Sequence, residues 1–143
     1  MDKIYVVYWT GGGNTLEMAN AIGDGIKEGG AEAEIVEVSS VTVDALKDAK
    51  NIALGCPAMG AEVLEESEME PFVADFEGVA SGKNLLLFGS YGWGDGEWMR
   101  DWVDRMKNAG ANIVGGEGLI CHEAPDDEAK AECISFGKQL ASA

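Results

Sequence analysis

Six small and polar residues near the N-terminus have the composition of an anion-binding loop. The run Thr10-Gly11-Gly12-Gly13-Asn14-Thr15 follows an apolar segment at 4–9 and precedes a helix-like segment at 16–27. Three consecutive glycines accept positive φ angles at little cost, so backbone N–H groups can converge on one point beside the positive end of the helix. Asn14 and Thr15 have side chains suited to capping that helix. The sequence therefore predicts a phosphate site, with a turn that binds nothing as the alternative.

The lack of positive charge in this loop restricts the phosphate it can hold. Lys3 is the only Lys or Arg before Lys27, and it lies at the far end of the apolar segment. The P-loop pattern Gly-x-x-x-x-Gly-Lys-[Ser/Thr] is absent, and Leu16 stands where the dinucleotide pattern Gly-x-Gly-x-x-Gly needs its last glycine. Amides, hydroxyls and a helix end favour a retained phosphate monoester over a nucleoside triphosphate.

Two further loops contain side chains that could bind a flat ring. Segment 90–96 places Tyr91 and Trp93 among glycines, where an uncovered aromatic ring is unfavourable. The alternative is that Trp93 folds back into the core of its own domain. Segment 56–62 contains Met59, a polarizable side chain that elsewhere often only fills gaps. Trp93 and Met59 together could bracket a planar heterocycle.

The elements that would position these loops alternate between strand and helix. Short apolar runs at 51–55 and 84–89 are typical of strands buried on both faces of a parallel sheet. In chain order we expect strand 4–9, helix 16–27, strand 33–38, helix 43–47, strand 51–55, helix 70–77, strand 84–89, helix 97–109, strand 111–120 and helix 126–141. This alternation predicts one α/β domain over residues 1–143, a five-stranded parallel sheet with helices on both faces. The three loops follow the first, third and fourth strands, so they should meet at the carboxyl edge where ligands bind.

Composition excludes several classes of function. The 143 residues carry a formal net charge of −16. Nucleic acid and anionic membranes would repel such a chain, whereas a partner with a basic face would attract it. Cys56, Cys121 and Cys133 are odd in number and form no Cys-x-x-Cys, so we expect reduced thiols and no metal site. We also expect neither a signal peptide nor a membrane span, and hence a cytoplasmic protein.

Two other groups of residues have mainly structural interpretations. The acidic run Glu62, Glu65, Glu66, Glu68 and Glu70 is most simply a solvated face, although its place beside the second loop suggests a docking patch as a hypothesis. Trp98 and Trp102 recur at helical spacing, which predicts core positions rather than electron relays.

The three loops together resemble those of the flavodoxins. Segment 8–15, Tyr-Trp-Thr-Gly-Gly-Gly-Asn-Thr, resembles their phosphate loop. Segments 55–60, Gly-Cys-Pro-Ala-Met-Gly, and 88–96, Phe-Gly-Ser-Tyr-Gly-Trp-Gly-Asp-Gly, resemble their two flavin loops. The resemblance spans nearly the whole chain and, at this length, is to the short-chain members. It implies a flavodoxin-like three-layer sandwich with strand order 2-1-3-4-5 and FMN at the point where that order reverses, a placement for which flavodoxin is itself the standard example.

The resemblance also implies a role for each loop. The first loop would surround the FMN phosphate, helped by the Ser90 hydroxyl. Trp93 and Met59 would stack on the two ring faces, and Glu62 would accept a hydrogen bond from the ring N3–H. The Gly60–Ala61 peptide would rotate so that the Gly60 carbonyl accepts the N5–H formed on one-electron reduction. The expected cofactor-binding residues are Thr10, Gly11, Gly12, Gly13, Asn14, Thr15, Pro57, Ala58, Met59, Gly60, Ala61, Glu62, Ser90, Tyr91, Gly92, Trp93 and Gly94.

Three positions complicate this assignment. The family loop commonly has Thr where this chain has Gly12, so one hydroxyl contact with the phosphate, of about 1.5–3 kcal/mol, is missing. Ala61 stands where relatives often have a polar residue, and a positive φ there would strain alanine. His122, the only histidine, lies in a loop that could approach the flavin edge and couple its potential to pH, although we expect a surface histidine without consequence.

The resulting hypothesis is a low-potential one-electron carrier with non-covalently bound FMN that shuttles between semiquinone and hydroquinone. An anionic hydroquinone is disfavoured in a chain of charge −16, which lowers the second potential. Expected partners are ferredoxin-type donors and acceptors with basic docking faces, and the chain itself is expected to be a monomer.

The alternatives are a stand-alone quinone or flavin reductase, a scaffold without flavin, and a receiver domain. A receiver domain would need an Asp where Gly55-Cys56 ends the third strand.

Overall fold

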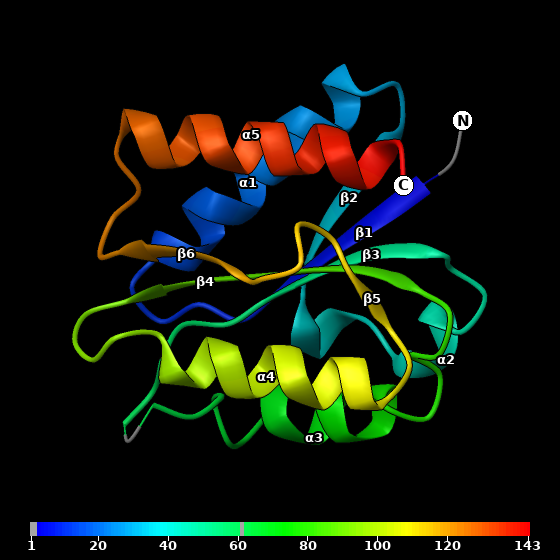
Figure 1. Cartoon of the computed structure of the whole chain (residues 1–143), viewed down its shortest axis with the longest axis horizontal. Coiled ribbons are helices and arrows are strands. Elements are labelled where there is room, and N and C mark those ends of the chain that lie inside the picture. The colour runs from blue at the N-terminus through cyan, green and yellow to red at the C-terminus, as the bar shows by residue number, and fades with distance from the viewer. Residues whose placement is uncertain (1–2, 61) are drawn as a thin grey trace.

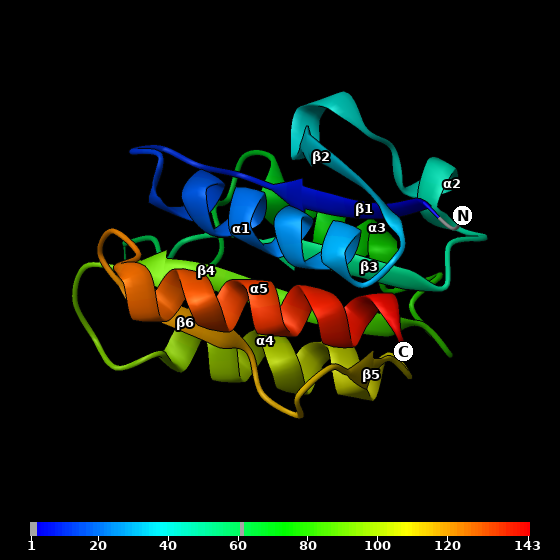
Figure 2. The ribbon, with the colours of Figure 1, turned by 90° about the horizontal axis from the view of Figure 1, so that it is seen from above.

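The computed structural model describes residues 3–60 and 62–143 as a parallel sheet between two layers of helices (Figure 1). Helices α1 and α5 cover one face of the sheet, and α3 and α4 cover the other (Figures 1 and 2). The elements in chain order are β1 (Lys3–Tyr8), α1 (Asn14–Glu28), β2 (Glu32–Glu37), the 3₁₀ turn η1 (Val38–Ser40), α2 (Val43–Leu46), β3 (Asn51–Gly55), α3 (Met69–Phe76), β4 (Asn84–Tyr91), α4 (Glu97–Asn108), β5 (Asn112–Ile113), β6 (Leu119–His122) and α5 (Asp127–Ala141).

Strand order confirms the predicted topology. The sheet runs β2-β1-β3-β4-β5, and β6 also pairs with β4, with every ladder between named strands parallel. The order therefore reverses between β1 and β3, as a 2-1-3-4-5 sheet requires. Apart from the last strand, the predicted elements agree with the observed ones to within one or two residues at each end.

The prediction of one continuous strand over 111–120 is wrong. Strand β5 pairs with Asn84 and Leu85, whereas β6 pairs with the segment 88–91 farther along β4. The chain between these two pairings loops out of the sheet because Gly115 and Gly116 have φ angles of 80° and 79°. Left-handed φ values are incompatible with an extended strand, so this glycine pair interrupts the strand.

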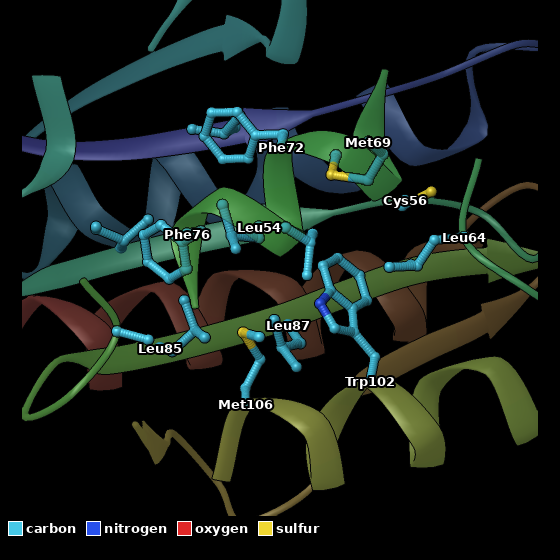
Figure 3. Close-up of a cluster of buried hydrophobic side chains, with 14 of the residues drawn as sticks. Leu54, Cys56, Leu64, Met69, Phe72, Phe76, Leu85, Leu87, Trp102 and Met106 are labelled. Atoms are coloured by element: carbon cyan, nitrogen blue, oxygen red, sulfur yellow. The ribbon is translucent and has the colours of Figure 1, made fainter. Parts of the chain in front are cut away.

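Two hydrophobic clusters fill the faces of the sheet. Between the sheet and the α1/α5 pair, Met18, Ile22 and Phe88 are fully buried. On the other face, Trp98 and Trp102 are each 1% exposed, which confirms that they are core residues. Figure 3 shows side chains of α4, including Trp102, pointing toward the sheet. The two layers hold β1, β3 and β4 rigidly, and thereby fix where the loops at their carboxyl ends begin.

Over residues 3–60 and 62–143, none of the helices combines the length and the apolar character needed to cross a bilayer.

Candidate functional site

The loop between β1 and α1 is shaped by backbone rather than by charged side chains. Gly13 has a φ of 96° and occupies the N-cap position of α1, where its carbonyl accepts a hydrogen bond from the Glu17 N–H (3.0 Å). The Thr10 hydroxyl accepts a hydrogen bond from the Gly13 N–H (3.0 Å) and closes the turn. The prediction that Asn14 or Thr15 caps the helix is wrong, because the glycine turn places both residues inside the first helical turn and no side chain caps α1.

Thr15 has an unexplained buried hydroxyl. Its side chain is 1% exposed, and its Oγ1 has no hydrogen-bond partner within the described chain. A buried polar group without a partner costs about 1–3 kcal/mol, so native proteins rarely keep one without a reason. The hydroxyl adjoins the α1 N-terminus, whose first N–H groups also lack side-chain partners. This arrangement suits an anion that accepts hydrogen bonds from both.

A hollow of about 160 Å³ brings the predicted loops together at the carboxyl edge of the sheet. In Figure 1 this edge is at the left, where the loops that follow β1, β3, β4 and β6 gather. None of the described residues that line the hollow is a Lys or Arg. They are Thr10, Gly11, Gly12, Asn14, Thr15, Pro57, Ala58, Ser90, Tyr91, Gly92 and Glu123.

The second loop forms a tight turn whose two ends pair with each other. Met59 and Val63 exchange two backbone hydrogen bonds of 3.0 Å each, and Met59 is partly buried. Within the turn, Gly60 and Glu62 have φ angles of 43° and 55°. Ala61 lies outside the described residues, so the expected strain at Ala61 and the rotation of the Gly60–Ala61 peptide stay predictions.

The third loop leaves its tryptophan in solvent. Trp93 is 63% exposed, which excludes the alternative that it folds back into the core. The exposed indole offers a flat apolar surface that a planar ligand could cover. The loop continues through Gly94 and Gly96, which have φ angles of 86° and 95° and lead into α4.

Glu62 connects the second loop with the third. Its Oε1 accepts hydrogen bonds from the Gly96 and Glu97 N–H groups, both at 3.2 Å, so its carboxylate lies at the positive end of α4. A Cβ on Gly94 would fall 2.5 Å from this carboxylate, and the φ of 86° at Gly94 also favours glycine there. The structure thus gives Glu62 a helix-capping role, which the sequence analysis missed, beside the role toward the ring that the resemblance implies.

Glu123 is a residue of the hollow that the predicted site omitted. Its carbonyl accepts a hydrogen bond from the Ser90 hydroxyl (2.7 Å), and its φ of 59° is left-handed. The sequence did contain a signal, because Glu123 directly follows the last strand, whose carboxyl end must reach the same edge as the other loops.

The prediction that the acidic run is a solvated face is wrong for part of the run. Glu65 is 7% exposed, and its carboxylate accepts hydrogen bonds from Ser67, Glu68 and Met69 at the start of α3. Burial alone would raise the pKa of the Glu65 carboxyl, but these hydrogen bonds outweigh it and lower the pKa to about 2. Glu70 forms a salt bridge with Arg105 at 2.7 Å. Both carboxylates therefore have structural partners that a sequence pattern does not reveal.

The three cysteines are free, and two of them are fully buried. Burial raises the pKa of Cys56 and of Cys133 to about 12, so both stay protonated at neutral pH. The Cys56 carbonyl accepts a hydrogen bond from the Trp98 indole N–H (3.0 Å), which anchors the start of the second loop to the core.

Comparison with known proteins agrees with this geometry. The family model described as Flavodoxin matches residues 6–137. The chain is 50% identical over 137 residues to the flavodoxin of Clostridium beijerinckii, covering 96% of this chain and 98% of that one. It is 44% identical over 140 residues to the flavodoxin of Megasphaera elsdenii, covering 98% and 99%. The chain belongs to the flavodoxin family. Flavodoxins carry electrons by means of bound FMN and are not enzymes, and the alternative of a stand-alone reductase is not favoured.

Solved flavodoxin structures superpose closely on this one. The solution structure of two-electron reduced Megasphaera elsdenii flavodoxin matches with a TM-score of 0.87 at 43% identity, covering 98% of this chain and 99% of that one. A flavodoxin from the domain Archaea matches with a TM-score of 0.87 at 30% identity, covering 98% and 96%. The three-layer fold expected from the sequence is therefore that of the flavodoxins.

Features of this chain agree with an FMN site. The unpartnered Thr15 hydroxyl and the uncapped N-terminus of α1 supply donors for a phosphate without any cation. A Cβ on Gly12 would meet no atom within 4 Å, so the loop also has space beside its backbone. The exposed Trp93 supplies a flat apolar surface for a ring.

Proposed function

We propose that the residues predicted to bind FMN do so, with the phosphate in the hollow at the start of α1 and the ring beside Met59 and Trp93. The single observation that carries this proposal is the Thr15 hydroxyl, which is buried without a partner next to free helical N–H groups. Bound FMN supplies the one-electron redox chemistry of the protein. The chain supplies binding, orientation and a defined electrostatic surrounding.

The negative charge of the chain lowers the reduction potential of the bound FMN. Added negative charge on the ring is disfavoured by the net charge of −16 and by the carboxylates of Glu62 and Glu123 beside the loops. Trp93 would cover the ring and exclude water, which strengthens this repulsion. We expect the second one-electron potential to lie well below that of free FMN.

The partners of this carrier are redox proteins with basic docking faces. The acidic composition supports transient contacts that are steered by charge and weakened by salt. Glu66 and Glu68 are exposed beside the second loop and would form part of the docking surface. We propose that the protein acts as a monomer in the cytoplasm, where the reduced state of its three thiols would be maintained.

A titration of the apoprotein with FMN and with riboflavin tests the binding proposal. FMN should bind with a dissociation constant well below that for riboflavin, because only FMN fills the hollow near Thr15. Stepwise reduction of the FMN complex should show two resolved one-electron steps. A protein that takes up no FMN would contradict the proposal, and direct oxidation of NADPH without a partner protein would favour a reductase instead.

A further inference from the structure

The end of β6 and the turn that follows it hold the end of β4 by three contacts with successive residues. The Ser90 hydroxyl donates to the Glu123 carbonyl (2.7 Å), and the Glu123 N–H donates to the Tyr91 carbonyl (2.8 Å). The third contact joins His122 Nε2 and the Gly92 carbonyl oxygen (3.2 Å). Glu123 has a φ of 59°, a conformation that costs free energy in a residue other than glycine and persists only where surrounding contacts enforce it. These contacts therefore fix the turn firmly against the start of the third loop.

The contact with Gly92 determines where the His122 ring carries its proton. A carbonyl oxygen can only accept a hydrogen bond, so Nε2 must be the donor. The neutral ring is then the tautomer protonated on Nε2, and acid adds a proton from solvent at Nδ1. The ring centroid lies 5.2 Å from that of Tyr91 in an edge-to-face arrangement, which holds the imidazole in place. Protonation would turn the bond to Gly92 into a charge-assisted one, which is stronger.

Holding the Gly92 carbonyl also orients the next backbone donor. The described peptide bonds are all trans, so the Gly92 carbonyl and the Trp93 N–H point in opposite directions across one planar unit. With the carbonyl held by His122, the Trp93 N–H points away from the histidine. His122 thus sets a donor of the loop that carries the exposed Trp93, although its own ring lies outside the hollow.

We propose that His122 is a positioning residue for the third cofactor loop. Its hydrogen bond to the Gly92 carbonyl becomes stronger when the imidazole is protonated. This inference rests on the proposed function, since it takes the third loop to bind the ring of FMN. It gives a role to a residue that the sequence analysis expected to be a surface histidine without consequence.

The charged groups around His122 are mostly carboxylates. Glu123 Oε1 lies 3.7 Å from Nε2. On the other side, Asp126, Glu128 and Glu132 line a second hollow together with His122 and Cys121. The Tyr91 ring on β4 also contacts the His122 ring, and none of the described residues lining that hollow is a Lys or Arg. The imidazolium would therefore be a positive charge close to the Glu123 carboxylate.

Two substitutions separate the hydrogen bond from the packing and from the titration. His122→Phe keeps an aromatic ring against Tyr91 but removes the donor. His122→Gln supplies an amide donor that does not titrate, and it serves as the conservative rescue. The FMN dissociation constant should rise about threefold to tenfold in His122→Phe at pH 8, and His122→Gln should recover most of that loss. Because His122 is exposed, unfolding midpoints should confirm that both variants fold.

The pH dependence gives the second readout. The ratio of the His122→Gln and wild-type dissociation constants, measured at the same pH, cancels the titration of the FMN phosphate and of the carboxylates. We expect this ratio to rise about twofold to fivefold between pH 8 and pH 5.5. In the apoprotein, the Trp93 backbone amide resonance should shift with pH in the wild type and stay constant in His122→Gln.

Each outcome decides a different question. Equal FMN affinities for wild type and His122→Phe, or a Trp93 amide that titrates identically in wild type and His122→Gln, would overturn the role of His122 alone. An apoprotein that binds no FMN in any of the three forms would overturn the proposed function together with this inference. A rescued affinity with a lost pH dependence would establish both parts of the proposal.

Discussion

The two halves of the proposed cofactor site differ in how far each is preorganised without the cofactor. In the phosphate half, small side chains and backbone form a closed turn, and the Thr15 hydroxyl is buried at the start of α1. In the ring half, Trp93 is 63% exposed and Val63 is 42% exposed, and Glu62 is in a left-handed conformation. The phosphate half is therefore preorganised, whereas the ring half presents apolar surface that a bound ligand would cover.

This difference separates affinity from potential. Contacts with the phosphate are the same in every redox state of the cofactor, so they change affinity without changing potential. Contacts with the ring differ between redox states, and each tenfold difference in binding shifts a one-electron potential by about 59 mV. We therefore expect substitutions in the phosphate half to act on affinity alone, and substitutions in the ring half to act on both.

Removal of the buried hydroxyl should have the largest effect. Thr15→Val keeps the volume of the side chain but removes a donor to a charged phosphate, so FMN affinity should fall about 10-fold to 100-fold. Riboflavin affinity and both potentials of the bound flavin should stay unchanged. Fluorescence titration with the two flavins measures this. Thr42→Val is the matched control, because Thr42 caps α2, away from the hollow. An equal loss for FMN and riboflavin would place the effect on the ring instead.

The second substitution tests the support of the ring half. Glu65 lies behind the second loop, and its hydrogen-bonded carboxylate has a pKa lowered from 4.5 to about 2. A lowered folded-state pKa stabilises the protein above about pH 4.5, and this stabilisation is lost as the pH falls toward 2. Glu65→Gln should therefore reduce the free energy of unfolding by about 1–3 kcal/mol at neutral pH, and by progressively less below pH 4.5.

Urea unfolding as a function of pH measures this effect. Glu66→Gln provides the control, since Glu66 is the exposed neighbour of the buried carboxylate. A deficit of the Glu65→Gln variant that stayed constant from pH 7 down to pH 2 would show that the loss comes from packing and not from the charge.

The exposed indole should affect both flavins equally. Trp93→Ala removes the stacking surface, so FMN and riboflavin affinities should each fall about fivefold to tenfold. Water would then reach the ring and solvate added negative charge, so the second one-electron potential should rise. Val63→Ala, an exposed apolar position in the same half, should change neither property. A loss confined to FMN would contradict the assignment of Trp93 to the ring.

The sequence predicted most of the fold because the central strands β1, β3 and β4 are short apolar runs. The run 51–55 has no helical period and can only be a buried strand, and the structure confirms it. The split of the last strand was not predictable from propensity, because it depends on the φ angles of Gly115 and Gly116 in the folded chain. In a sequence, such a glycine pair can equally mark a bulge or a weak strand.

The candidate site was less predictable than the fold, for a physical reason. Loop residue types predicted which segments would meet, but the side-chain partners depend on three-dimensional position. Glu62 and Glu65 looked alike in the acidic run, yet one caps α4 and the other holds the start of α3. The contact of His122 with Gly92 was not predictable, because the two residues are 30 positions apart in sequence.

The smallest expected effect is a gain in FMN affinity from a substitution in the phosphate half. Gly12 has no positive φ, and a Cβ there would meet no atom within 4 Å, so a larger residue fits without strain. Gly12→Thr should add a hydroxyl beside the phosphate and raise FMN affinity up to about tenfold. The gain is smaller if the loop loses conformational entropy when it binds the phosphate. Gly12→Val has the same shape without the hydroxyl and separates hydrogen bonding from stiffening of the loop. If both variants bind FMN equally well, the gain comes from reduced backbone freedom, and the phosphate half is less preorganised than its closed turn suggests.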